Sequence, residues 1–315
     1  MAPLACRGSG GVARVNPDVL APDRPASVRA TLVPRPPSLL LLPALAWLGL
    51  FFFVPLALML AISFASRGTY GGVVWILSLA NYANVLDPLY VKVFLRSVLL
   101  AFVTTALCLA LGFPIAYYIA RLPARRQGIW LLLVMIPFWT NFLVRTYAWI
   151  FILRTEGLMN QVLAGLGLIG SPVDVLYTET AIVIGLVYGY LPFMILPLYA
   201  AVERLSPSLV EAAWDLYASR WAVLWRVIVP LTKPGLAAGC ILVFIPSVGA
   251  FMTPDLMGGA RTMMIGNLIQ HEFLVARDWP FGSAISLVLM ASVLLGLAIY
   301  LRAEGAGRGK EWARG

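Results

Sequence analysis

Charged residues are scarce in this sequence. Asp, Glu, Lys and Arg make up 12% of its 315 residues, whereas hydrophobic residues make up 61%. Soluble proteins contain about 25% charged and about 45–50% apolar residues. So few charges cannot cover the surface of a water-soluble fold of this size, and the many aliphatic and aromatic residues exclude a disordered chain. The composition therefore excludes an ordinary cytosolic enzyme and predicts an integral membrane protein.

Side chains that bind metals are equally few. The chain has three cysteines, Cys6, Cys108 and Cys240, and one histidine, His271, with no CxxC or Cys/His spacing. A structural zinc ion needs about four nitrogen or sulfur ligands. We therefore expect no metal site, cysteines that act as small buried side chains, and a solvated His271 in an outer loop.

Motifs for nucleotide binding and hydrolysis are also missing. The sequence contains no GxxxxGK[ST] phosphate loop, no HExxH and no GxSxG after a strand. We therefore expect a protein that is not an enzyme and binds no cofactor of its own. If ATP drives its activity, a partner subunit must hydrolyse that ATP.

Long apolar runs are abundant. A membrane-spanning helix needs about 20 mostly apolar residues, and the runs predict an all-α, polytopic membrane protein with about six spans. Pro246 and Gly249 interrupt the fifth run, and residues 253–259 after it are expected to form a loop or a broken helix. The expected spans are Leu39–Phe64, Val93–Ala120, Ile129–Leu153, Ala181–Val202, Leu236–Met252 and Ala284–Leu301.

Basic residues predict the orientation and the domain limits. Most of the 23 lysines and arginines lie in four segments that would share one side of the membrane: 1–38, 121–128, 203–235 and 302–315. The positive-inside rule places that side, with both termini, in the cytoplasm. The Pro/Arg-rich residues 1–38 are expected to be a disordered tail, residues 39–302 the transmembrane domain, and residues 303–315 a second cytoplasmic tail.

The loop 203–235 is expected to contain two short amphipathic helices. Ser208 and Glu211 have the S-x-x-E spacing of a capping box, so a helix should begin there. A second helix should end at Pro230. Helical spacing puts an apolar stripe on one face of the first helix, formed by Leu209, Ala212, Ala213, Leu216 and Tyr217. Two interpretations remain open: a helix on the lipid surface, or a helix that docks into a partner, with Glu211 offering a charge.

The same loop resembles a known family. Glu211-Ala212-Ala213, followed by residues 228–231 (Ile-Val-Pro-Leu), looks like the EAA loop of inner-membrane permease subunits of binding-protein-dependent ABC transporters. The resemblance implies the MetI-like (type I) permease fold and a coupling helix that enters a cleft of the ATPase subunit. The family usually has glycine where this chain has Tyr217, and tyrosine resists the positive φ that glycine allows.

Further motifs resemble the B-type permease subunit of polyamine (spermidine/putrescine) importers. They are residues 111–117 (LGFPIAY), 136–141 (IPFWTN), 145–149 (RTYAW), 185–194 (GLVYGYLPFM) and 276–282 (ARDWPFG). The resemblance implies a second permease subunit in a heterodimer, an ATP-binding subunit dimer, a periplasmic solute-binding protein and an inner-membrane location. Polyamine permeases commonly have a glutamate where this chain has Ala250.

A path for a polycation needs carboxylates and aromatic faces. We expect Asp255, the acid near the fifth span, to take part, and the other candidates for lining the path are Trp139, Asn141, Tyr188 and Tyr190. Arg145 in the third span would repel a cation. A structural role, with an outer-side acid as partner or with the head group at the surface, is therefore favoured for it over contact with the solute.

Small residues and prolines give two further expectations about the spans. Gly112, Ala116 and Ala120 form a stripe that favours a helix-packing seam. Pro192 and Pro197 mark the fourth span as a helix that can break.

Alternatives to a polyamine permease remain. They are a permease for another small solute (thiamine, an iron complex or an oxyanion), a stand-alone channel or secondary transporter, and an intramembrane enzyme. A secondary transporter predicts inverted repeats or buried charge pairs. An intramembrane enzyme predicts a buried His/Asp/Ser set. Neither pattern is found in the sequence.

Overall fold

The computed structural model describes residues 38–312, except residues 70, 260 and 261. The tail expected at residues 1–38 lies almost wholly outside this range. The chain divides after Pro55 into two compact units, and each is described by itself. Helix α1 (Ser38–Ser63) crosses the division, and its residues 38–55 are all that the structure describes of the first unit.

The second unit is helical apart from one short hairpin, β1 (Ser66–Arg67) paired antiparallel with β2 (Val73–Val74). Two π-helical segments, η2 and η3, interrupt its α-helices. The remaining elements are α2 (Ala80–Val85), α3 (Pro88–Ala120), α4 (Ala124–Trp139), α5 (Phe142–Leu153), α6 (Leu158–Gly165), α7 (Glu179–Glu203), α8 (Pro207–Asp215), α9 (Arg220–Val223), η2 (Leu224–Ile228), α10 (Val229–Val248), η3 (Pro254–Gly258), α11 (Ile265–Leu274) and α12 (Trp279–Trp312).

Within the part of the chain that the structure describes, length and hydropathy identify five helices that can cross a membrane, and up to six when a bent pair of helices is counted as one span. The bent pair joins Ala124–Trp139 to Phe142–Gly165 at an angle of 88°. The prediction of an all-α protein with about six spans is therefore confirmed. The single spans are Pro43–Ser63, Pro88–Ala120, Glu179–Glu203, Arg220–Val248 and Trp279–Arg302.

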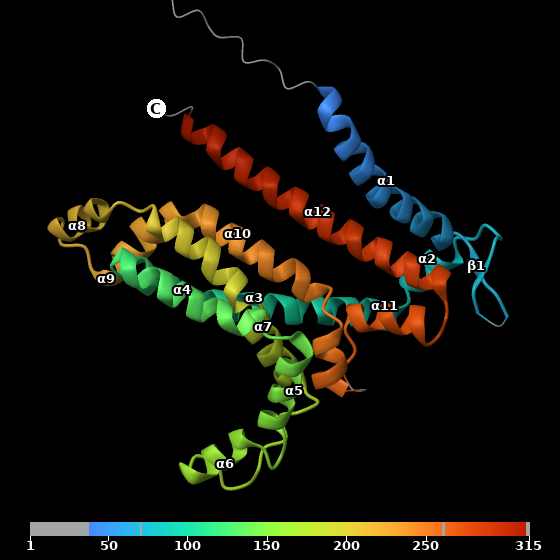
Figure 1. The fold of residues 1–315 in the computed structure, drawn as a ribbon, viewed down its shortest axis with the longest axis horizontal. Helices are drawn as coiled ribbons and strands as arrows, with labels where there is room; N and C mark the ends of the chain where they lie inside the picture. The colour runs from blue at the N-terminus through green and yellow to red at the C-terminus, as the bar shows by residue number, and fades with distance from the viewer. Residues whose placement is uncertain (1–37, 70, 260–261, 313–315) are drawn as a thin grey trace, which may run out of the picture. The chain divides into compact units, whose positions relative to one another are not determined.

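Helices α3, α7 and α10 pack against one another and form the centre of the second unit (Figure 1). The expected small-residue seam is confirmed where α3 meets α7. Ala116 is fully buried, and a Cβ atom added to Gly112 would lie 3.0 Å from Met194 Cγ. Small residues thus let the two backbones approach closely, which gives van der Waals contact where lipid offers no hydrophobic driving force.

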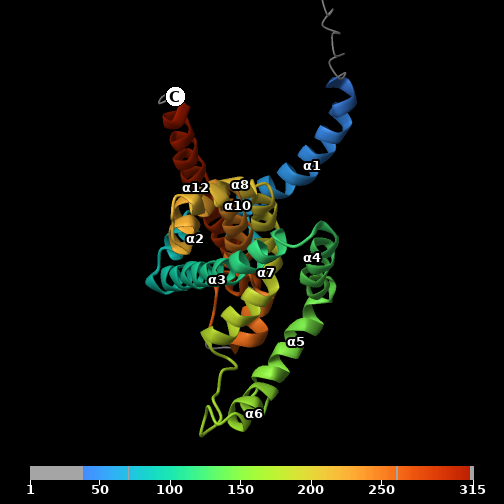
Figure 2. The ribbon, with the colours of Figure 1, turned by 90° about the vertical axis from the view of Figure 1, so that its left-hand side faces the viewer.

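The third predicted span, Ile129–Leu153, is wrong as a single helix. The chain breaks at Thr140 and Asn141, and Figure 2 shows α5 and α6 leading away from α4 beyond the break. Asn141 is a favourable N-cap residue, and its Oδ1 accepts a hydrogen bond from Leu143 N at 2.9 Å. The side chain therefore starts a new helix within the apolar run.

The fourth predicted span does not break. Helix α7 is continuous from Glu179 to Glu203, with Pro192 and Pro197 inside it. A proline in a helix leaves one carbonyl without its usual amide partner. In α7, neighbouring helices surround this region, since Pro192 and Met194 are buried. The packing thus holds the helix together.

The fifth predicted span, Leu236–Met252, begins and ends later in the sequence than the observed helix. A continuous helical run extends from Arg220 through η2 to Val248. The loop or broken helix expected at residues 253–259 contains the π-helical turn η3. The sixth span ends at Arg302, close to the predicted end, and α12 continues as a helix through residues 303–312, the start of the segment expected to be a cytoplasmic tail.

Candidate functional site

Helix α8 begins two residues earlier than the S-x-x-E spacing predicts. Ser206 is the N-cap residue and Pro207 occupies the first turn, so Ser208 lies inside the helix and forms no capping box with Glu211. The Ser206 hydroxyl lies 2.7 Å from the Ser208 hydroxyl. Proline favours the first helical position because its fixed φ suits the helix and its missing N–H needs no partner there. The expected cap is therefore wrong, although the expected helix is present.

The buried face of α8 also differs from the predicted stripe. Val210 is 1% exposed and forms a cluster with Val223 and Ile228 from the following helix. Of the predicted stripe, only Ala213 packs against this cluster. The other four residues are exposed and face away from the chain's own core: Leu209, Ala212, Leu216 and Tyr217.

Helix α8 ends in a left-handed turn at Tyr217, where φ is 56°. Tyr217 N donates to Trp214 O at 2.8 Å, and Ala218 N donates to Ala213 O at 3.1 Å. These two bonds form a Schellman motif, in which the residue after the helix usually is glycine. The chain therefore keeps the turn that glycine would permit, with tyrosine in its place.

The second predicted loop helix does not end at Pro230. Residues 220–248 form one helical run in which η2 precedes Pro230. Val229 N donates to Leu224 O, five residues earlier, so the turn is widened just before the proline. A wider turn moves the carbonyl that a proline ring would meet in a regular α-helix. This segment is therefore the start of the fifth span and not a separate surface helix.

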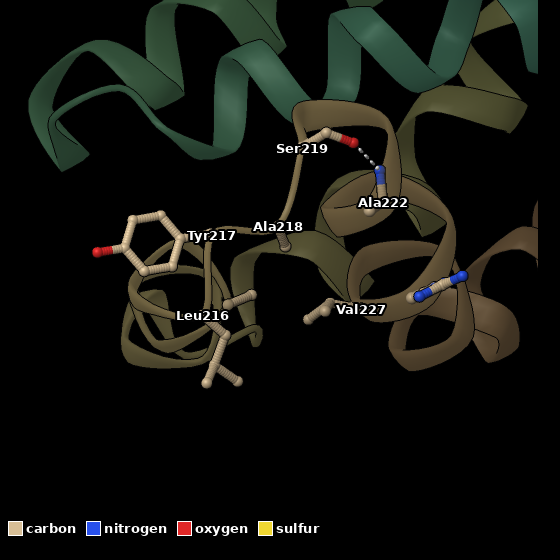
Figure 3. Close-up of a pocket in the computed structure, with 8 residues that line it drawn as sticks. Leu216, Tyr217, Ala218, Ser219, Ala222 and Val227 are labelled. Atoms are coloured by element: carbon tan, nitrogen blue, oxygen red, sulfur yellow. Dashed lines mark hydrogen bonds between the residues drawn. The ribbon is translucent and has the colours of Figure 1, made fainter.

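A cavity of about 580 Å³ lies between the end of α8 and the helical run that follows it (Figure 3). Leu216, Ala222 and Val227 give it an apolar lining, and Arg226 adds a positive charge. Ser219 caps α9, with its Oγ accepting from Ala222 N at 3.3 Å. Tyr217 also lines this cavity, and its side chain is 98% exposed.

The charges on α8 are all negative. Glu211 and Asp215 are exposed, and Pro207–Asp215 contains no lysine or arginine. Helices that lie on a membrane surface are typically rich in Lys and Arg, which attract anionic lipids. An acidic helix with an exposed apolar stripe is better suited to a protein groove that carries basic residues.

Arg145 stabilises the break between α4 and α5 through a hydrogen bond and ring contacts. Its Nη1 donates to Pro137 O at 3.4 Å, and Thr140 Oγ1 donates to the same carbonyl at 2.6 Å. The guanidinium also lies over two rings, with Cζ 5.3 Å from the centroid of Phe142 and 5.7 Å from that of Tyr188. Among the described residues Arg145 forms no ion pair, so the first of its two predicted structural roles, pairing with an outer-side acid, is not found there.

Two of the path candidates lie on α7. The Tyr188 ring meets Trp149 edge-on, with centroids 5.4 Å apart, and Tyr190 Oη donates to Pro246 O at 3.3 Å. Helix α7 packs against η3, because Gly185 lies beneath Met257 and Thr253. Asp255 is an exposed residue of this η3 segment.

The other two path candidates lie at the α4–α5 break. Trp139 is 70% exposed at the end of α4, and Asn141 caps α5. Ala250 occupies the position at which polyamine permeases commonly carry glutamate. It is 8% exposed and packs with Leu100, Ile182 and Met264. A carboxylate at this position would lose its hydration among apolar side chains, which is costly.

No cluster of three or more His, Cys, Asp or Glu residues that could hold a metal ion is found in residues 38–312 outside the three omitted positions. Cys108 is buried and its thiol donates to Val187 O at 3.7 Å, while Cys6 lies outside the described residues. His271 is exposed as expected, with Nδ1 3.8 Å from Glu272 Oε1. Burial raises the pKa of the Glu272 carboxyl, and His271 opposes this shift.

The helical spans, the acidic loop helix and the broken third span define a polytopic membrane permease. The chain belongs to the family described as "Binding-protein-dependent transport system inner membrane component", which residues 112–304 match. It is therefore a multi-pass inner-membrane component of a binding-protein-dependent importer.

Relatives and one solved structure agree with this membership. The chain is 46% identical over 258 residues to a spermidine/putrescine transport system permease protein, PotB, of Salmonella typhimurium, covering 82% of this chain and 90% of the relative. For PotB of Escherichia coli the identity is 45%, covering 82% and 94%. A bacterial alginate ABC transporter, solved with a periplasmic protein that holds an alginate pentasaccharide, shares the fold: the TM-score is 0.63 at 18% identity, covering 82% of this chain and 90% of that chain.

Proposed function

We propose that this chain carries a polyamine, spermidine or putrescine, across the inner membrane as one permease of an ABC importer. The observation that carries the proposal is the 46% identity over 82% of the chain to a spermidine/putrescine permease. Exposed Asp255 and the aromatic faces of Tyr188 and Trp149 support it, since ammonium groups that leave water need carboxylates or aromatic faces.

The proposal includes three kinds of partner and an orientation. An ATP-binding subunit dimer docks on α8 from the cytoplasm, a second permease completes the path, and a periplasmic protein delivers the solute. The chain itself binds no cofactor, and ATP is hydrolysed by the partner. The acidic charge of α8 and its exposed stripe support the docking site.

A solute panel tests the proposal. The complete complex is reconstituted in vesicles that contain ATP, and uptake of labelled spermidine, putrescine, thiamine and molybdate is compared. We expect ATP-dependent uptake of the two polyamines and none of the other solutes. Uptake of thiamine or molybdate without polyamine uptake would assign the permease to another solute.

Replacement of Asp255 by Asn is expected to slow spermidine uptake about tenfold. Loss of the carboxylate removes a charge partner for an ammonium group that has left water, which is worth about 1–2 kcal/mol for a partly exposed pair. The measurement is the initial uptake rate in vesicles with matched amounts of complex. Asp255→Glu keeps the charge and should retain most of the rate. Equal rates for wild type and Asp255→Asn would remove this residue from the path.

The topology gives an independent prediction. Reporter fusions at Gly170 and Gly315 are expected on opposite sides of the membrane, with Gly315 in the cytoplasm. The reason is that three spans lie between the two positions: Glu179–Glu203, Arg220–Val248 and Trp279–Arg302. Alkaline phosphatase and green fluorescent protein activities would report each side. Fusions that report the same side would show that one of these three helices does not cross the membrane.

A further inference from the structure

Tyr217 holds a backbone conformation that is unfavourable for tyrosine. Its φ of 56° lies in the left-handed region, where an L-residue places Cβ too close to its own carbonyl. Glycine would make the same Schellman turn without this strain. Strained residues persist where the strain serves a function, so the question is what the tyrosine side chain does there.

Two other non-glycine residues in the described chain have positive φ, and both serve internal contacts. Tyr177 has a φ of 64°, and its N donates to Met257 O at 2.9 Å. Arg277 has a φ of 52°, and its carbonyl accepts from Gly72 N at 3.2 Å. The Tyr217 ring, by contrast, is 98% exposed and points away from the chain. The strained backbone of Tyr217 thus directs the ring towards solvent and not into the core of the chain.

The surface around Tyr217 suits a protein and not a lipid. Leu216 beside it is 83% exposed, and Glu211 and Asp215 give α8 a negative charge. Anionic lipid head groups would be repelled by these two carboxylates. A protein surface with an apolar slot, basic residues facing Glu211 and Asp215, and an acidic residue facing Arg226 would complement both the ring and the charges.

The surface also offers a hole next to the projecting ring. The 580 Å³ cavity is lined by Leu216, Ala222 and Val227 and by Tyr217 itself, so it can accept an apolar side chain. Aromatic residues that insert into pockets are frequent hot spots of protein interfaces, and they tend to pair with a hot spot of the partner. The projecting ring can fill a pocket of the partner, and the cavity can receive an apolar side chain of the partner.

We infer that Tyr217 is the anchor residue of this chain for the ATP-binding subunit. Its ring inserts into an apolar slot bordered by basic residues, and the cavity beside it receives an apolar side chain of the same subunit. The inference rests on the proposed function, since it takes the ATP-binding subunit as the occupant of this surface. It adds that this chain selects its own ATPase through a side chain that replaces the glycine of the turn.

Three variants of Tyr217 in the complete complex, held in lipid nanodiscs, test the inference. Tyr217→Gly removes both the strain and the ring, Tyr217→Ala removes the ring and keeps the strain, and Tyr217→Phe keeps the ring. Dissociation of the ATP-binding subunit and thermal unfolding of the permease are measured for each. Trp75→Ala, which removes an exposed aromatic ring far along the chain, is the matched control.

We expect Tyr217→Gly to weaken ATPase association about 30-fold, as for a hot-spot residue, while the melting temperature of the permease rises by about 2–4 °C. Tyr217→Ala should weaken association equally without the rise. Tyr217→Phe and Trp75→Ala should bind like wild type. Tyr217→Gly that binds as tightly as wild type would overturn the inference.

The two proposals fail in different ways. If Glu211→Arg releases the ATP-binding subunit while Tyr217→Gly does not, the anchor inference is wrong and the docking function stands. If the wild-type chain holds no ATP-binding subunit at all, the proposed function is wrong.

Discussion

Reversal of the charge at Glu211 is expected to abolish solute-stimulated ATP hydrolysis in the assembled transporter. Glu211 is exposed at the centre of α8, so an arginine there changes the free energy of unfolding by only about 0.5 kcal/mol. In an interface with basic residues, the same change places like charges together, which costs several kcal/mol. The affinity of the ATP-binding subunit for α8, and with it the solute-stimulated rate of ATP hydrolysis, should therefore fall on the order of a hundredfold or more.

Ala212→Trp is the second variant for the same surface. Ala212 is exposed, so a bulky ring would block close approach of a partner without disturbing the chain's own core. Ala213 is less suitable because it packs against the cluster of Val210, Val223 and Ile228. Glu156→Arg, a charge reversal in an exposed position of another loop, is the matched control and should leave hydrolysis unchanged. If Glu211→Arg and Ala212→Trp complexes assemble and hydrolyse ATP normally, α8 is not the docking helix.

The second large effect concerns the contact between α7 and α10. Replacement of Gly235 by Ala is expected to destabilise the folded permease by about 1–3 kcal/mol. A Cβ atom at this position would collide with Ala201 Cβ and lie 2.7 Å from Pro197 O. Both groups belong to α7, where a backbone carbonyl cannot rotate away. The two helices would have to separate at the centre of the unit.

Thermal unfolding in nanodiscs checks this expectation, with Gly296→Ala as the control. A Cβ atom at Gly296 in α12 meets no atom within 4 Å, so alanine there should be neutral or stabilise the helix by up to about 1 kcal/mol. A melting temperature of Gly235→Ala equal to that of Gly296→Ala would mean that α7 and α10 do not pack as closely as described.

The helical class and the number of spans could be predicted from the sequence because each depends on long apolar runs. The ends of the helices were harder to predict from the sequence. Pro192 and Pro197 suggested a break, yet α7 is continuous because its surroundings hold it together. The real break, at Thr140 and Asn141, had a signal in the sequence: Asn141 is a good N-cap residue four positions after Pro137, but the apolar run around it obscured this signal.

The loop 203–235 shows a similar limit. The helical spacing of apolar residues predicted helix α8, but this spacing could not show which face of the helix the rest of the chain covers. Val210, which lies outside the predicted stripe, is buried by Val223 and Ile228 from a helix that follows the turn. Tertiary contacts of this kind are not encoded in the periodicity of one helix. The π-turn before Pro230 also escaped prediction, since it has no sequence pattern of its own.

Accumulation of labelled spermidine against its concentration gradient tests the central claim most directly. Vesicles contain the complete complex, with the periplasmic protein outside and ATP inside, and carry either wild-type permease or Glu211→Arg. The account predicts uphill accumulation by wild type that stops when ATP is removed, and none by Glu211→Arg. Spermidine entry that continues without ATP, and equally with Glu211→Arg, would contradict an ATP-driven permease and indicate a channel.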